Sequence, residues 1–141
     1  MELCHQTSSE LIRLDIVKAG RLIPLFIYAA LAETLRRAGV LHNHWFLPAC
    51  ESLYLTREGP VVSQGAPLLS GMSDVPKFNG DALIAALRTD QAGKSTFPEF
   101  LLACWRAGIV RYEVDFTART CTYFGCAGEK YIEDYPAVVI D

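Results

Sequence analysis

The most constraining feature of this sequence is a segment of strictly alternating polarity, residues 110–116. Its apolar members are Tyr112, Val114 and Phe116, and its charged members are Arg111, Glu113 and Asp115. Alternation with a period of two is typical of a β-strand that is buried on one face only. A short polar segment at 117–119 and a second apolar segment at 120–124 then predict an antiparallel hairpin, with 131–133 as a further strand.

Two helices are predicted just before this hairpin. The first begins at a cap formed by Asn79 or Asp81 and ends at Ala92-Gly93. The second begins at Thr96-Phe97-Pro98-Glu99, which has the spacing of a capping box with proline in the first turn, and ends at Gly108. The predicted order of elements in the second half of the chain is therefore two helices followed by a hairpin.

The first half predicts the same order of elements. We expect a helix from a capping box at 7–10 to Gly20, a helix from Pro24 to Gly39, a strand at 40–47, a turn at 48–49, a return strand at 52–55, and a loop at 57–60. Glycine and proline are frequent at 63–80, which we interpret as a linker.

Short motifs recur between the halves in one register. Residues 37–40 (Arg-Ala-Gly-Val) correspond to 106–109 (Arg-Ala-Gly-Ile), and Tyr54 corresponds to Tyr123. These matches predict an internal duplication, and chance similarity is the alternative. The predicted single domain, residues 1–141, holds one pseudo-repeat at about 8–62, the linker at about 63–80 and a second pseudo-repeat at about 81–136. Two αα-ββ repeats would form an α+β fold, an antiparallel sheet with helices packed on one face.

Composition and charge exclude several classes of protein. Half of the residues are hydrophobic (51%), which is too many for a disordered chain. Sixteen acidic residues outnumber 13 basic ones, so the basic face that a nucleic-acid partner requires is not expected.

The distribution of apolar residues and cysteines predicts a cytoplasmic protein with no membrane partner. The longest apolar segment, 22–32, is shorter than the roughly 20 residues that span a bilayer, and residues 1–5 do not resemble a secretory signal. Five cysteines without a Cys-x-x-Cys motif favour buried free thiols in a reducing compartment.

Residues 80–140 also carry a family resemblance. The motifs are Phe97-Pro98-Glu99-Phe100, the run 107–116, Thr122-Tyr123-Phe124-Gly125 and Gly128-Glu129-Lys130-Tyr131. Together they resemble a bacterial and phage-associated family, domain of unknown function 1398, which is labelled phage envelope protein. The resemblance implies a small soluble protein without an established activity, and it transfers no catalytic residue. The first half departs from the pattern at 42–46, where this chain has His-Asn-His-Trp-Phe.

Two histidines and two carboxylates are the candidate catalytic residues. His42 and His44 share one face of a strand, because positions two apart point the same way. In the repeat register His44 aligns with Glu113, and Asp115 is the second candidate carboxylate. An imidazole beside a carboxylate is a workable general base near neutral pH. The alternative is a mixed charged face whose exposed pairs contribute about 0–1 kcal/mol each.

The two histidines also raise the hypothesis of a metal site. A third ligand would come from Cys50, Cys126 or one of the two carboxylates. His-x-His lacks the paired ligand spacing of structural zinc sites, so we predict neither a metal nor another cofactor.

Aromatic residues in the hairpins are the candidate ligand-binding residues, namely Trp45, Tyr54, Tyr112 and Tyr123. Core and cross-strand packing is the alternative role for these rings. Our leading hypothesis is a binding or interaction module whose partner is a small molecule or a protein, and a homodimer through sheet edges is possible in principle. The second hypothesis is a cofactor-independent enzyme for cyclisation, isomerisation or hydrolysis, with a pocket between the halves.

Overall fold

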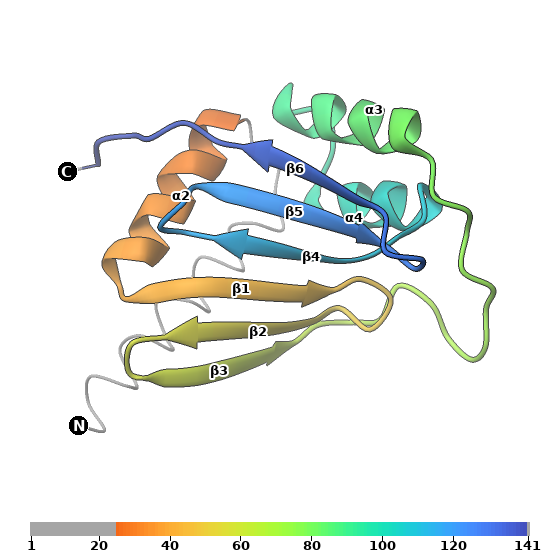
Figure 1. Cartoon of the computed structure of the whole chain (residues 1–141), viewed down its shortest axis with the longest axis horizontal. Helices are drawn as coiled ribbons and strands as arrows, with labels where there is room; N and C mark the ends of the chain where they lie inside the picture. Colours follow the sequence, from red (N-terminus) through yellow and green to blue (C-terminus); the bar gives the residue numbers. More distant parts are fainter. Residues whose placement is uncertain (1–24, 141) are drawn as a thin grey trace.

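Six antiparallel strands form one sheet, and three helices of the described residues lie on one of its faces (Figure 1). The computed structural model describes residues 25–140, so the predicted helix at 7–20 lies outside them. The elements are α2 (Leu25–Arg37), β1 (Val40–Phe46), β2 (Glu51–Thr56), β3 (Gly59–Gln64), α3 (Gly80–Gln91), α4 (Phe97–Arg106), β4 (Ile109–Asp115), β5 (Thr120–Gly125) and β6 (Lys130–Asp134). The predicted α+β class with an antiparallel sheet is confirmed.

The helix starts follow from the caps that the sequence encodes. Asn79 caps α3, since its side-chain oxygen accepts a hydrogen bond from the backbone N–H of Ala82 at 3.1 Å. Thr96 and Glu99 form the predicted capping box of α4, with reciprocal hydrogen bonds of 2.9 and 3.3 Å.

None of the helices within residues 25–140 has the length and apolar character that a membrane-spanning helix requires.

The two hairpins meet at the centre of the sheet. The strand order is β3-β2-β1-β4-β5-β6, so β1 and β4 join the halves by antiparallel pairing. In that register Trp45 lies opposite Tyr112, and His44 lies opposite Glu113. The alternation of β4 is as predicted, because Tyr112 and Val114 are buried under the helices.

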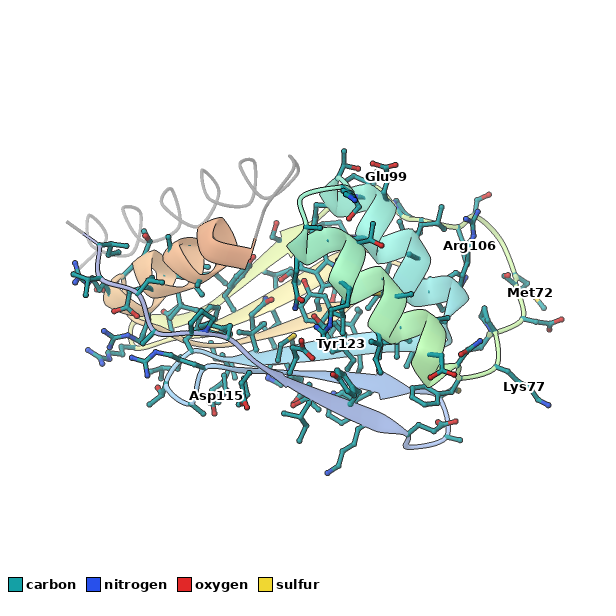
Figure 2. All side chains as sticks on the ribbon, turned by 90° about the horizontal axis from the view of Figure 1, so that it is seen from above. Met72, Lys77, Glu99, Arg106, Asp115 and Tyr123 are labelled. Carbon is teal, nitrogen blue, oxygen red and sulfur yellow. The ribbon has the colours of Figure 1, made fainter. Side chains whose placement is uncertain are left out.

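The helical side of the sheet holds the core. Figure 2 shows Tyr123 between the helices and the sheet, while Asp115 points to the other side. The ring of Tyr123 contacts Phe100 of α4 edge-on at 6.4 Å and Tyr112 at 5.6 Å, measured between centroids. These contacts anchor α4 to the second hairpin.

The prediction of a loop at 57–60 and a linker from residue 63 is wrong in part. Only Arg57 and Glu58 form the turn, and Gly59–Gln64 is the edge strand β3. Glycine and proline suggested a loop, but proline is tolerated at a sheet edge, where its missing N–H breaks no ladder. The strand also crosses the predicted end of the first pseudo-repeat at residue 62.

The connection between β3 and α3 packs against the fold. The backbone N–H of Leu68 donates to Pro48 at 2.9 Å, and that of Asn79 donates to Ala107 at 2.8 Å. Gly108 has a φ of +86°, and a Cβ there would lie 2.6 Å from the backbone of Phe78. The close approach of two backbone segments therefore requires glycine at this position.

We expect Gly108→Ala to destabilise the protein much more than Gly128→Ala. Gly128 has a similar φ of +89° but open space around it, so its substitution carries only the backbone strain of about 1–2 kcal/mol. Gly108→Ala adds the clash with Phe78 and is expected to exceed about 4 kcal/mol. Urea unfolding of both variants measures the difference, and equal losses would contradict the packing of Phe78 against Gly108.

The end of α3 contains a carboxylate that opposes folding at neutral pH. Burial raises the pKa of Asp90 from 3.8 to about 6, although Ser95 donates a hydrogen bond to it at 3.1 Å. The folded state therefore binds a proton more tightly than the unfolded chain. The contribution of Asp90 to stability is therefore greatest below its unfolded pKa and is lost as pH rises from about 4 to about 6.

Asp90→Asn should therefore stabilise the protein at neutral pH. The amide retains an acceptor for Ser95 and removes the charge, so the variant is expected to exceed the wild type in unfolding free energy at pH 7. The gain should shrink as pH falls and vanish below about pH 4. Urea unfolding across this pH range measures it, and a difference that does not change with pH would contradict the assignment.

Candidate functional site

The sheet separates the predicted site residues into two groups on opposite faces. From His42 to Phe46, after an irregularity in the pairing of β1 with β2 near Val40, the even-numbered positions of β1 face away from the helices and the odd-numbered ones face toward them. The predicted catalytic residues lie on the open face: His42, His44, Glu113 and Asp115. The predicted ligand-binding residues lie on the helical face: Trp45, Tyr54, Tyr112 and Tyr123. The structure therefore does not bring the two groups into one site.

On the open face, Glu113 joins His44 to Arg111. Its Oε1 atom lies 3.2 Å from Nδ1 of His44 and 2.5 Å from Nη1 of Arg111. The Arg111 guanidinium also covers the ring of Phe124 at 3.8 Å. The side chains of His44 and Glu113 are about a third exposed (29% and 35%), so solvent screens their pairing.

Asp115 has a structural role in the turn between β4 and β5. Its Oδ1 atom accepts hydrogen bonds from the backbone N–H groups of Thr117 and Ala118, at 3.0 and 2.9 Å. His42 lies opposite Asp115 in the sheet and 6.5 Å from His44 between ring centroids. Within residues 25–140, no three His, Cys, Asp or Glu side chains form a group that could hold a metal ion.

The helical face contains an apolar cavity between α2 and the sheet. Its empty space is about 480 Å³ with the open mouth included. The lining residues come from α2, the start of α4, three strands and the residue after β4: Leu31, Ala32, Leu35, Asn43, Trp45, Tyr54, Phe97, Tyr112, Val114 and Phe116. Three of the four predicted ligand-binding residues line this cavity, and Tyr123 does not.

Trp45 is the central aromatic residue of this lining. Its ring is nearly parallel to that of Tyr112, with 5° between the planes and 6.1 Å between centroids. Phe97 meets it edge-on at 5.1 Å. The residue is only 6% exposed, and its indole Nε1 finds no hydrogen-bond acceptor among the described residues. A buried donor without a partner costs about 1–3 kcal/mol.

Asn43 is a buried polar residue of the site that the sequence analysis did not select. Its Nδ2 donates to Ser52 Oγ at 2.5 Å and to the carbonyl of Leu53 at 3.3 Å. The signal was available, because Asn43 shares the buried parity of Trp45. Leu31 of α2 was also missed as a cavity residue, since its position depends on how α2 crosses the sheet.

The buried thiols do not supply a nucleophile. Burial raises the pKa of Cys121 to about 12 and also raises those of Cys50 and Cys104, so all three stay protonated near neutral pH. Cys126 differs from the prediction of buried cysteines because it is exposed.

Comparison with known proteins identifies a matching family and similar mycobacterial proteins. A family model described as "Protein of unknown function (DUF1398)" matches residues 26–134. Similar proteins of Mycobacterium tuberculosis and Mycobacterium bovis, each named only as an uncharacterized protein, are 58% identical over 108 residues. The matched part is 77% of this chain and 66% of each relative, so the chain spans just under two thirds of their length.

Neighbouring substitutions in β1 test the division between the two faces. His44→Ala should change the unfolding free energy by less than about 1 kcal/mol, because it removes only a partly exposed pair. Trp45→Ala should cost about 3–5 kcal/mol, because it empties a buried site. Urea unfolding measures both, and a comparable loss for the two variants would contradict the assigned register of β1.

Proposed function

The chain belongs to the DUF1398 family, whose description assigns no activity. From the geometry of the site, we propose that the protein is a module that binds a small molecule in the cavity beneath α2. The observation that carries the proposal is the indole Nε1 of Trp45, which is buried at the cavity wall without an acceptor among the described residues. We place the module in the cytoplasm, and the free thiols of the described residues support that compartment.

The cavity has the character that small-molecule sites usually have. Such sites are concave, mostly apolar and aromatic, with a few polar groups that orient the ligand. Here the apolar walls come from α2 and the aromatic residues of β1, β2 and β4, and Asn43 and Trp45 supply polar groups. Each square ångström of apolar surface that a ligand covers contributes about 25 cal/mol before the entropic costs of binding.

We also propose that the two halves arose by duplication, with the cavity as the point where they diverged. Equivalent strands begin 69 residues apart: β4 at 109 against β1 at 40, and β5 at 120 against β2 at 51. In this register Leu31 of α2 corresponds to Phe100 of α4, which fills the core of its own half. A smaller side chain on α2 is therefore consistent with open space in the first half.

A second candidate function is acid–base catalysis on the open face, for a cyclisation, isomerisation or hydrolysis. The contact of 3.2 Å between His44 and Glu113 favours it. Both side chains face away from the cavity, so a ligand bound beneath α2 does not reach them. We rank this candidate second because solvent and Arg111 compete for the same carboxylate.

A ligand screen with matched variants tests the proposed function. Small aromatic compounds should raise the thermal midpoint of the wild type, since a ligand that binds only the folded state stabilises it by mass action. Leu31→Phe fills the cavity with the residue found at the equivalent position of α4, and it should abolish the shift while the protein stays folded.

His44→Ala is the control, because it changes the opposite face of the same strand. The binding proposal expects the ligand-induced shift to be the same as in the wild type. Loss of the shift in His44→Ala, with its retention in Leu31→Phe, would instead support the second candidate.

A further inference from the structure

We infer that the ligand of this cavity is a neutral, planar compound of about one ring whose carbonyl oxygen accepts a hydrogen bond from Nε1 of Trp45. This inference rests on the proposed function and adds the chemical class of the ligand. It follows from three properties of the part of the cavity wall that the structure describes: a buried donor without an acceptor, a lining without charged side chains, and flat aromatic surfaces.

The first property fixes the acceptor. Indole is a donor only, so Trp45 can be satisfied by nothing except an acceptor atom. None of the described residues supplies one within hydrogen-bonding distance of Nε1. Trp45 lines the cavity, and we therefore assign the missing acceptor to a ligand bound there. A ligand oxygen placed there removes the penalty of the buried N–H, and a ligand without an acceptor leaves the penalty in place.

The second property fixes the charge. Among residues 25–140, the ten that line the cavity include no Lys, Arg, His, Asp or Glu. Glu33 on α2 is buried nearby in the helix, but it is paired with Arg36 and is not part of the lining. A carboxylate ligand would lose its hydration without gaining a cation, and an ammonium ligand would find no carboxylate. A neutral carbonyl carries the acceptor without this penalty.

The third property fixes the shape. The rings of Trp45 and Tyr112 are almost parallel, and Phe97 closes the wall edge-on. Flat rings pack against such surfaces with offset or edge-to-face contacts. A water molecule is a poor occupant, because it needs two to four polar partners and the wall is largely apolar. The total space of about 480 Å³ includes the open mouth, so the enclosed part is smaller, and we assign it a ligand of about one ring.

Three probes of nearly equal shape separate these properties. Acetophenone carries a carbonyl oxygen, α-methylstyrene replaces that oxygen by a methylene group, and benzoate adds a charge. Titration of the full chain, followed by calorimetry and by the indole N–H resonances, gives the three dissociation constants. We expect acetophenone to bind about tenfold more tightly than α-methylstyrene, which is the usual magnitude for one hydrogen bond. Benzoate should bind more weakly than acetophenone.

Trp45→Phe is the matched variant, since it keeps an aromatic ring and removes the N–H. In this variant, the dissociation constants of acetophenone and α-methylstyrene should be about equal. Wild-type spectra give an independent readout if this variant does not fold: acetophenone should shift the indole N–H signal of Trp45 downfield, and α-methylstyrene should not.

The outcomes distinguish the inference from the proposed function. If the wild type binds acetophenone and α-methylstyrene equally well, the ligand needs no hydrogen-bond acceptor for Trp45. The inference would then be wrong, while the proposed function as a binding module would remain. Tighter binding of benzoate would overturn the neutral class. If none of the three probes binds in the millimolar range, the proposed function itself fails.

Discussion

The antiparallel pairing of β1 with β4 is the constraint on which the rest of the structure depends. These central strands join the two hairpins, and their register places Trp45 beside Tyr112 and His44 beside Glu113. A shift of one residue would move every side chain of a strand to the other face of the sheet. The register between β1 and β4 therefore determines both the burial of Trp45 and the partial exposure of His44.

This register gives the protein two faces with different chemistry. Under the helices, aromatic rings of both hairpins pack into one core, and α2 leaves a cavity beside Trp45. On the open face, charged, polar and apolar side chains are mixed, and Phe46, Val62 and Ile132 are exposed. Figure 2 shows α2, α3 and α4 on the first face, so the sheet itself separates the cavity from the His44–Glu113 pair.

Local rules explain why much of the fold was predictable from the sequence. The capping box at Thr96–Glu99 and the alternation in β4 depend on neighbouring residues only, and both are as predicted. The cap of α3 was predicted at Asn79 or Asp81, and it is Asn79. The strand β3 was missed because Pro60 is compatible with a loop and with a sheet edge, and only the tertiary context decides between them.

The site was predictable only in part, for the same reason. Parity along β1 and the repeat register raised the hypothesis of an imidazole beside a carboxylate, and Nδ1 of His44 lies 3.2 Å from Oε1 of Glu113. Parity also predicted inward-facing aromatic rings. The cavity depends on how α2 crosses the sheet and on the volumes of side chains such as Leu31 and Phe97, which no local pattern encodes. The candidate catalytic and ligand-binding residues lie on opposite faces, because the sheet separates the histidines from the aromatic rings.

The central claim is that a ligand binds on the helical face of the sheet, beside Trp45. The most direct measurement is a set of intermolecular nuclear Overhauser effects between bound acetophenone and the assigned side chains of the protein. The account predicts effects from the ligand to Leu31, Trp45 and Phe97, which line the cavity. Effects to Phe46 or Phe124 on the open face, without any to the cavity residues, would contradict it.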